Sequence, residues 1–282
     1  MNLSVTRKLT PEEVEKINSL TKYPSILTYH GLGQKGNLTE EILVRFPDNV
    51  KVIGTEKVDG TNGRIIIMPD KTYLIGSREE LIYAQGDFIE NPVSEIVPTL
   101  KPIAERIVGR PDLFPADDIY IFFLEAFGGS GITPASKTYT TTKTAAARMF
   151  DVAFIPSPDQ PNGNWGWHTV LDMTRDKISS WREHGGQFYS NESVLKCWAD
   201  LIGVSLTPRL EITPPPLSVE ETYEWLKKAI TKSLVVLDDK AQGKPEGIVV
   251  RTETREYIAK IRFEDYERTM RTRAKLKEML EG

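Results

Sequence analysis

The stretch EKVDGTNGR at residues 56–64 places one lysine in a short polar turn between two segments of strand-forming residues. A free lysine has a pKa near 10.4, so Lys57 needs desolvation or nearby cations before it can act as a nucleophile. Gly60 allows a tight turn and a close approach of the backbone to a ligand, and Asp59 and Asn62 can hydrogen-bond a ligand or the amine. An ordinary polar β-turn with a solvated lysine explains the same residues, so this stretch needs partners elsewhere in the chain.

Five further strings follow the lysine along the chain. They are GSR at residues 76–78, FLEAFG at 123–128, MFDV at 149–152, EGIVVR at 246–251 and AKIR at 259–262. Together with KVDG at 57–60 they resemble, in the same order and at similar spacing, the motifs of the covalent nucleotidyltransferases. This superfamily contains ATP-dependent DNA ligases, RNA ligases and mRNA capping enzymes. One such string is weak evidence for a family, whereas six in register are strong evidence.

The residue at position 62 separates the groups of this superfamily. DNA ligases and capping enzymes usually carry arginine there, whereas this chain has Asn62 within a Gly-Thr-Asn sequence. That sequence, and the spacing from Phe150 to Glu246, are similar to the RNA ligase 2 group, which includes RNA-editing ligases. The resemblance extends over residues 50–262 and implies an ATP-dependent RNA ligase that joins RNA 5′-phosphate and 3′-hydroxyl ends, with DNA as a possible partner.

The resemblance implies a role for each matching residue. Lys57 would attack the α-phosphorus of ATP and release pyrophosphate to form a lysyl-adenylate, whose AMP would pass to the RNA 5′-phosphate and be displaced by the 3′-hydroxyl. Lys260 and Arg262 alternate along one strand, so both can hold the α-phosphate and lower the pKa of Lys57. The other implied roles are Glu56 at the adenine edge, Phe150 stacked on adenine, Arg78 and Glu125 at the ribose, Asn62 at a phosphate, Asp59 in the catalytic turn, and Glu246 orienting a hydrated Mg²⁺ or Mn²⁺.

Three departures from the family pattern limit what the resemblance implies. Asp59 stands where many RNA ligase 2 relatives have histidine, and Arg262 stands where a second lysine is usual; arginine preserves the charge but not the geometry. Only twenty residues follow Arg262, so we expect neither a C-terminal OB-fold nor a helical accessory domain. Self-adenylylation is therefore a safer prediction than efficient sealing.

The composition of the 282-residue chain, 39% hydrophobic and 27% charged, is typical of a soluble globular protein. The single cysteine excludes an internal disulfide, and three scattered histidines leave no zinc site. Residues 1–10 lack the apolar core of a signal peptide, and no apolar run reaches the roughly 20 residues that span a bilayer. We therefore expect a cytoplasmic monomer without a membrane partner.

The net charge of −4 does not by itself indicate a nucleic-acid binder, since such proteins often carry a basic footprint. Any basic surface must be local. The candidate is a run of cations without an intervening acid near the end of the chain: Arg268, Arg271, Arg273, Lys275 and Lys277. A solvated helix face explains this run equally well.

The predicted fold class is α+β: an antiparallel-sheet nucleotidyltransferase domain, similar to ATP-grasp-like ligases, with flanking helices. We expect an N-terminal helical extension over 1–48, packed on a nucleotidyltransferase domain over 49–282. Short β-rich runs predict strands at 51–55, 64–68, 72–76, 119–127, 148–155, 248–252 and 257–262. Caps and helical spacing predict helices after Thr10, over 92–108, 177–184, 191–203 and 218–233, and from 264.

Some segments carry weaker signals. Residues 31–36 formally match the dinucleotide-binding Gly-x-Gly-x-x-Gly pattern, but the strand before them and the helix after them are poor, so we expect a mobile loop rather than a Rossmann site. At best a short helix follows over 37–46. Prolines 98 and 102 are expected to break or kink the helix over 92–108, residues 130–147 to form an exposed loop, and residues 204–212 to form a strand.

Other functions remain open on the sequence alone. A minimal ATP-dependent DNA ligase is the alternative within the enzymes, and a capping guanylyltransferase is less favoured because no OB domain is expected. An adenylylated module that binds nucleic-acid ends without sealing them is the alternative from another class. Six coincidental strings in an unrelated protein would be the remaining explanation.

Overall fold

The computed structural model describes residues 9–85, 87–89, 95–114, 117–132, 135–157, 159, 165–241 and 243–281. The chain forms two compact units. Unit 1 comprises Met1–Ser25, Gly60–Ser136 and Thr142–Leu206, and unit 2 comprises Ile26–Asp59, Lys137–Thr141 and Thr207–Gly282. Each unit has its own antiparallel sheet and its own helices, which confirms the predicted α+β class. The predicted division into 1–48 and 49–282 stays a prediction.

Unit 1 is built on a seven-stranded antiparallel sheet. In spatial order its strands are β10 (Phe188–Tyr189), β9 (Ala145–Ile155), β8 (Ile119–Gly128), β4 (Thr61–Ile67), β5 (Tyr73–Ser77), β6 (Leu81–Ala84) and β7 (Asp87–Phe88). The interior strand β8 is apolar almost throughout because helices cover both faces of the sheet. The strands predicted around 64–76, 119–127 and 148–155 are confirmed.

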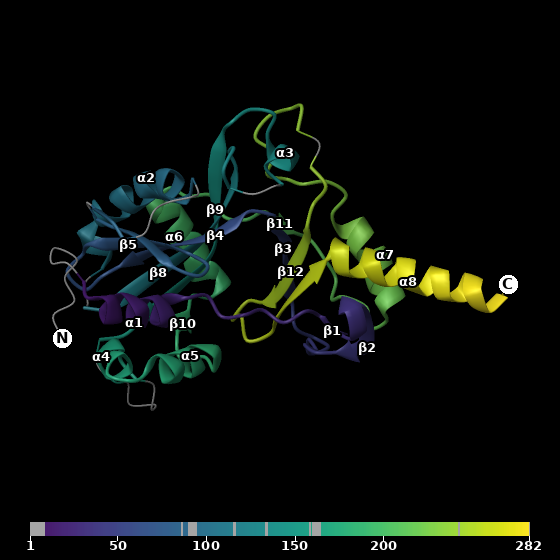
Figure 1. Ribbon diagram of the computed structural model, residues 1–282, viewed down its shortest axis with the longest axis horizontal. Helices are drawn as coiled ribbons and strands as arrows, with labels where there is room; N and C mark the ends of the chain where they lie inside the picture. Colours follow the sequence, from purple (N-terminus) through teal and green to yellow (C-terminus); the bar gives the residue numbers. More distant parts are fainter. Residues whose placement is uncertain are drawn as a thin grey trace. The chain divides into compact units, whose positions relative to one another are not determined.

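Alternating residues of β4 supply two separate cores in unit 1. Ile65 and Ile67 pack in a cluster under α2 (Ile96–Val108) and α6 (Glu192–Ile202). Ile66 packs in the opposite cluster under the helices α1 (Pro11–Thr21), α4 (Trp167–Leu171) and α5 (Arg175–Glu183). Figure 1 shows α1, α4 and α5 on one side of this sheet and α2 on the other.

The helix ends follow the predicted caps. The Thr10 hydroxyl accepts from the Glu13 N–H and the Glu13 carboxylate accepts from the Thr10 N–H, with Pro11 as the first helical residue of α1. Asn191 caps α6 by accepting from the Val194 N–H at 2.9 Å. The helix expected over 92–108 is not broken within its described part, because α2 runs from Ile96 to Val108 with Pro102 inside it. The alternative expectation, a kink at the prolines, stays a prediction.

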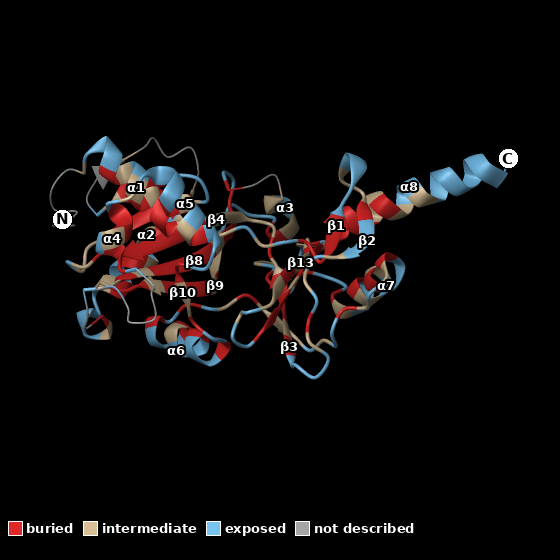
Figure 2. Ribbon diagram, turned by 90° about the horizontal axis from the view of Figure 1, so that it is seen from below, coloured by how far each residue is buried: buried red, intermediate tan, exposed pale blue. Residues whose placement is uncertain are grey.

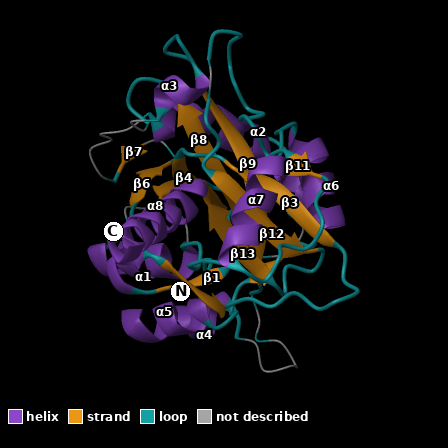
Figure 3. Cartoon of the chain, turned by 90° about the vertical axis from the view of Figure 1, so that its right-hand side faces the viewer, coloured by secondary structure: helices purple, strands orange, loops and turns teal. Residues whose placement is uncertain are grey.

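Unit 2 contains a four-stranded antiparallel sheet and a small two-stranded one. The larger sheet has the order β11 (Arg209–Leu210), β3 (Val52–Lys57), β12 (Gly247–Thr252) and β13 (Ile258–Arg262). Figure 3 shows β3, β12 and β13 side by side. Alternate residues such as Ile248, Val250 and Ile261 face a buried core that includes residues of α7 (Val219–Ala229) and α8 (Phe263–Glu281).

Three weaker expectations fail. Instead of a helix over 37–46, unit 2 has a hairpin of β1 (His30–Leu32) and β2 (Leu38–Ile42), with the 3-10 turn η1 (Gln34–Gly36) between the strands. Contacts far along the chain select the strand: the Leu38 N–H donates to Thr269 at 2.8 Å, and Glu40 binds Val219 and Arg273. This hairpin also excludes the strand–helix context of a dinucleotide site at 31–36.

The other two failures concern loops. Only β11 is strand within 204–212. The predicted exposed loop over 130–147 contains the short helix α3 (Ser136–Tyr139), with Tyr139 fully buried, and the start of β9. The remaining short element is the 3-10 turn η2 (Pro111–Leu113). Across the part of the chain that the structure describes, no helix combines the length and apolarity needed to cross a bilayer.

Candidate active site

Three predicted cations of unit 2 share one face of the four-stranded sheet. Lys57 ends β3 and lies opposite Gly247 of β12, which lies opposite Arg262 of β13. Lys260 is two residues before Arg262 and lies opposite Val249 in the neighbouring row. Residues that are opposite each other in antiparallel strands point to the same face, as do alternate residues of one strand. The register therefore brings Lys57, Lys260 and Arg262 onto one face, and Gly247 lies between Lys57 and Arg262.

Lys57 forms an ion pair with Glu246, the residue just before β12. The Lys57 Nζ lies 2.5 Å from the Glu246 Oε2, and the two side chains are 28% and 19% exposed. Burial raises the pKa of Glu246, although the charge and the hydrogen bond of Lys57 act in the opposite direction. Gly247 leaves the strands room to approach, because a Cβ there would lie 2.1 Å from the Ile261 carbonyl oxygen.

Arg262 is held by an acidic partner at the start of α8. Its Nε and a terminal nitrogen donate to the two carboxylate oxygens of Asp265, at 2.8 and 3.1 Å. Burial lowers the pKa of Arg262, but the hydrogen bond and charge of Asp265 outweigh it, so the pKa is raised. Such a bidentate pair fixes the plane of the guanidinium and keeps it charged.

Glu56 lies on the opposite face of the same sheet from Lys57. It is opposite Ile248, a core residue, and is 1% exposed. Its carboxylate accepts from the Ser233 hydroxyl at 2.6 Å and from the Leu234 N–H at 2.7 Å. The side chain that the resemblance assigns to the adenine edge is therefore buried and holds the segment at residues 233–234.

Tyr139 holds the turn after Lys57 and was not among the residues predicted for the site. The Asp59 backbone N–H donates to the Tyr139 hydroxyl at 2.6 Å, and the Leu237 N–H donates to the Tyr139 carbonyl at 2.7 Å. Burial raises the pKa of Tyr139, so its hydroxyl remains protonated. Its sequence neighbourhood, rich in Thr, Ser and Lys, gives no apolar signal that would have identified it.

In unit 1, two predicted residues lie in one row of the seven-stranded sheet. Asn62 of β4 is opposite Glu125 of β8, which is opposite Arg148 of β9. The Asn62 Oδ1 is buried and accepts no hydrogen bond from the residues that the structure describes. A buried acceptor without a donor is costly, which favours a ligand at this position. Arg148 was not predicted, although its register beside Glu125 places it in the same row.

Phe150 lies at a bulge of β9. Phe123 is opposite Asp151 and Leu124 is opposite Met149, so Phe150 is an extra residue with no partner in the ladder. A β-bulge changes the direction of a side chain relative to a regular strand. The ring is half-buried and lies next to the rings of Tyr23 and Phe123, with centroids at 5.1 and 6.2 Å.

Arg78 follows β5 in a turn with a buried arginine behind it. The Arg78 side chain is 69% exposed and lies 3.5 Å from the Glu79 carboxylate. Fully buried Arg64 donates to the Arg78 carbonyl at 3.3 Å and also to Asn18, and burial lowers the pKa of Arg64 to about 9. Gly76 provides the space, because a Cβ there would lie 2.8 Å from the Arg64 Nε.

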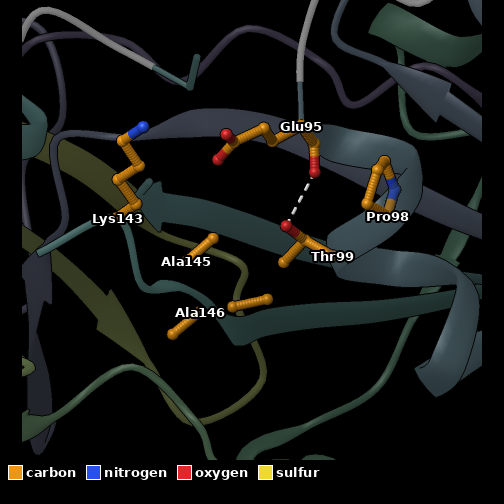
Figure 4. Close-up of a pocket in the computed structure, with 7 residues that line it drawn as sticks. Glu95, Pro98, Thr99, Lys143, Ala145 and Ala146 are labelled. Atoms are coloured by element: carbon orange, nitrogen blue, oxygen red, sulfur yellow. Dashed lines mark hydrogen bonds between the residues drawn. The ribbon is translucent and has the colours of Figure 1, made fainter. Parts of the chain in front are cut away.

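A pocket of about 490 Å³ in unit 1 has no predicted site residue in its lining (Figure 4). It is lined by Glu95, Pro98, Thr99, Lys143, Ala145, Ala146 and Ala147. The Thr99 hydroxyl donates to the Glu95 carbonyl at 2.7 Å, and the Ser130 hydroxyl donates to the Glu95 carboxylate at 2.8 Å. Its polar groups are thus largely engaged by neighbours in the same unit.

Ion pairs occupy several cations of the basic run in α8. Arg268 binds Asp265 at 2.6 Å, Arg273 binds Glu40 at 2.7 Å, and Lys277 lies 3.7 Å from Glu281. Figure 2 shows the end of α8 as exposed. The arrangement fits an ion-paired helix face better than a dedicated nucleic-acid surface.

Comparison with known proteins gives one family. A family model described as RNA ligase matches residues 50–277. No curated protein gives a significant match.

Several solved structures of Naegleria gruberi RNA ligase are similar. A lysine-to-alanine mutant with ATP and Mn is 12% identical, with a TM-score of 0.47 and coverage of 86% of this chain and 63% of that chain. A second lysine-to-alanine mutant with ATP and Mn is 13% identical, with a TM-score of 0.49 and coverage of 88% and 63%. A structure with pyrophosphate is 14% identical, with a TM-score of 0.47 and coverage of 83% and 62%. The chain spans less than two thirds of these relatives.

Proposed function

The chain belongs to the RNA ligase family, whose model matches residues 50–277, and on this premise we propose that it is an ATP-dependent RNA ligase acting through a lysyl-adenylate. The observation that carries the proposal is the register of the four-stranded sheet. It places Lys57, Lys260 and Arg262 on one face, with Glu246 bonded to Lys57. A nucleophilic amine beside fixed cations suits attack on a phosphate.

Three phosphoryl transfers make up the proposed reaction. The neutral amine of Lys57 attacks the α-phosphorus of ATP, the bond to pyrophosphate breaks, and the amine proton passes to a base. The AMP then moves to an RNA 5′-phosphate, which regenerates Lys57, and a 3′-hydroxyl displaces AMP to form the phosphodiester. Lys260 and Arg262 stabilise the negative charge that develops on the phosphate oxygens.

Glu246 restrains Lys57 before substrate binds. Its carboxylate already accepts a hydrogen bond from the Lys57 Nζ at 2.5 Å, and burial raises its pKa. Lys57 and Glu246 must part before the amine can attack, so the ion pair restrains the nucleophile until substrate phosphates replace the carboxylate as its partner.

Glu246 also fits a hydrated Mg²⁺ or Mn²⁺. No group of three or more His, Cys, Asp or Glu side chains that could hold a metal occurs among the described residues. A magnesium ion that keeps its waters and binds substrate phosphates needs few carboxylates, so one half-buried glutamate is sufficient. When bound, the metal would neutralise phosphate charge during the transfer.

Residues of unit 1 are proposed to bind the nucleoside. Phe150 would stack on the adenine, Glu125 and Arg78 would bind the ribose, and Asn62 would contact a phosphate. The buried Oδ1 of Asn62, which lacks a donor among the described residues, supports a ligand there. We propose that Glu56 contributes through the 233–234 segment that it holds, and that Asp59 contributes through the turn bonded to Tyr139.

Covalent labelling tests this function. Wild type, Lys57→Ala and Lys275→Ala are incubated with α-labelled ATP, or with α-labelled GTP, in Mg²⁺ or Mn²⁺. We expect ATP-dependent label on wild type and on Lys275→Ala, whose substituted lysine is exposed on α8, and none on Lys57→Ala. A chase with nicked and single-stranded RNA or DNA bearing 5′-phosphates then identifies the acceptor.

The outcomes separate the candidate functions. Transfer of label to RNA followed by sealing supports the ligase, and transfer to DNA alone would replace RNA by DNA as the substrate. Stable adenylylation without any sealing would favour a module that binds nucleic-acid ends. No label on wild type, after removal of any bound AMP by pyrophosphate, would refute the proposed function.

A further inference from the structure

We propose that Tyr23 is a positioning residue for the ring of Phe150, so that the segment after helix α1 is part of the nucleotide-binding machinery. This inference rests on the proposed function, which assigns Phe150 to the adenine. It concerns a stretch that lies outside the matched residues 50–277. The argument uses only residues of unit 1.

A hydrogen bond joins Tyr23 to the neighbour of Phe150. The Tyr23 hydroxyl donates to the Asp151 Oδ2 at 2.7 Å, across 128 residues of chain. Asp151 is 1% exposed, so its carboxylate depends on donors within the protein. A hydroxyl bonded to a buried carboxylate is a strong and directional contact. Tyr23 therefore fixes the backbone position from which Phe150 projects.

Ring contacts add a second constraint. The rings of Tyr23 and Phe150 are 5.1 Å apart with planes at 90°, and those of Tyr23 and Phe123 are 4.8 Å apart at 67°. Phe123 and Phe150 are stacked at 6.2 Å with planes at 27°. Edge-to-face pairs of this kind are favourable and set the relative orientation of the rings. Tyr23 and Phe123 together determine the plane of the Phe150 ring.

The backbone just before Tyr23 is itself held by two side chains. The buried Gln187 side chain donates to the Leu20 carbonyl at 2.9 Å and to the Lys22 carbonyl at 3.1 Å. The Arg182 guanidinium donates to the Ser19 carbonyl, one turn earlier. These bonds satisfy carbonyls at the end of α1 that have no partner within the helix. The chain that delivers Tyr23 is therefore a rigid support.

Phe150 needs this support because it lies at a bulge. Its neighbours Met149 and Asp151 pair with β8, whereas Phe150 has no partner residue in the ladder. A ring that must stack on a base loses affinity if it first has to be ordered. Loss of Tyr23 should therefore weaken ATP binding and leave the rate of phosphoryl transfer at saturating ATP nearly unchanged.

The test measures ATP dependence of lysyl-adenylate formation in Tyr23→Phe, Tyr23→Leu and a control. The control, Tyr83→Phe, alters a buried tyrosine in the core on the opposite face of the same sheet. We expect Tyr23→Leu to raise the KM for ATP by roughly tenfold, equivalent to about 1.4 kcal/mol, with the limiting rate within about twofold of wild type. Tyr23→Phe should raise the KM less, and Tyr83→Phe should not change it.

A second measurement tests the inference even if no lysyl-adenylate forms or one of the variants does not fold. The Kd for ATP, measured by calorimetry on the Lys57→Ala protein with and without Tyr23→Phe, should rise several-fold. If folded Tyr23 variants keep the KM and Kd of the parent proteins for ATP, the inference is overturned. Adenylylation of wild type in the same experiment would still support the proposed function. If wild type binds ATP but forms no adduct, the proposed function is refuted. The Kd of the Tyr23 variant for ATP then still decides whether Tyr23 supports the nucleotide site. A wild type that binds no ATP overturns both.

Discussion

The two sheets of this protein place their candidate site residues by different means. In unit 2, Lys57, Lys260 and Arg262 are aligned by strand register alone, and a short motif is enough to specify each. In unit 1, Phe150 lies at a bulge and its surroundings come from Tyr23, far away in the chain. Side chains placed by a regular ladder can be inferred from sequence, whereas side chains placed by tertiary packing cannot.

The largest expected effect in this comparison concerns the aligned cations. Replacement Lys260→Ala should slow lysyl-adenylate formation by about 10²–10³-fold, since it removes a fixed charge that stabilises the transition state. The thermal midpoint should change little, because the Lys260 side chain is half-exposed. Single-turnover labelling with ATP measures the rate, and Lys275→Ala is the control for removing a lysine. A rate within about threefold of wild type would show that Lys260 does not contribute to catalysis, although the register places it on the same face as Lys57.

A pair of glycines compares how rigidly the backbone is held in the two units. A Cβ at Gly60 in unit 1 would lie 2.2 Å from the Ala126 carbonyl oxygen, whereas a Cβ at Gly54 in unit 2 would meet the end of the half-exposed Ile212 side chain at 2.7 Å. We expect Gly60→Ala to reduce the free energy of unfolding by roughly 2–4 kcal/mol, and Gly54→Ala by about 1 kcal/mol or less. Urea denaturation measures both. Equal losses of unfolding free energy in the two variants would mean that the backbone near Gly60 shifts as easily as the Ile212 side chain.

The smallest expected effect is a pH dependence of stability that arises from His30 in unit 2. His30 is fully buried; its Nδ1 lies 2.7 Å from the Tyr266 hydroxyl and its Nε2 lies 2.9 Å from the Leu217 carbonyl oxygen. Burial lowers the pKa of His30, so the folded state favours the neutral ring. Its contribution to stability is present above about pH 6.5 and is lost as the pH falls from there through the folded pKa.

The matched variant for this prediction is His30→Gln, which can make both hydrogen bonds without a titratable group. As the pH falls from about 6.5 to 5, wild type should lose more stability than the variant, as measured by urea denaturation at each pH. Parallel pH profiles for the two proteins would show that His30 does not titrate on unfolding.

Much of the fold could be predicted because local and tertiary signals agree. The capping residues Thr10 and Asn191 begin helices as expected, and the apolar run of β8 forms a buried interior strand. The failures occur where distant contacts decide. Residues 38–42 form a strand because residues of α7 and α8 bind Leu38 and Glu40.

The candidate site shows the same division. Motifs identify Lys57, Glu246 and the two cations of β13, which the register brings onto one sheet. The orientation of Glu56 into the core follows from its place next to Lys57 on a strand, since neighbouring residues face opposite sides. Tyr139 and Tyr23 could not be predicted, because each acts through a hydrogen bond to a residue at least 80 positions away.

The central claim, that Lys57 is the nucleophile, is tested most directly by locating the adduct. Wild type is incubated with ATP and Mg²⁺, digested, and mapped by mass spectrometry for a peptide that carries AMP. We predict a single adenylated peptide containing Lys57, with the AMP attached to its Nζ, and the loss of the adduct on addition of pyrophosphate. An adduct on another lysine, such as Lys260, or no adduct in protein that binds ATP, would contradict the assignment.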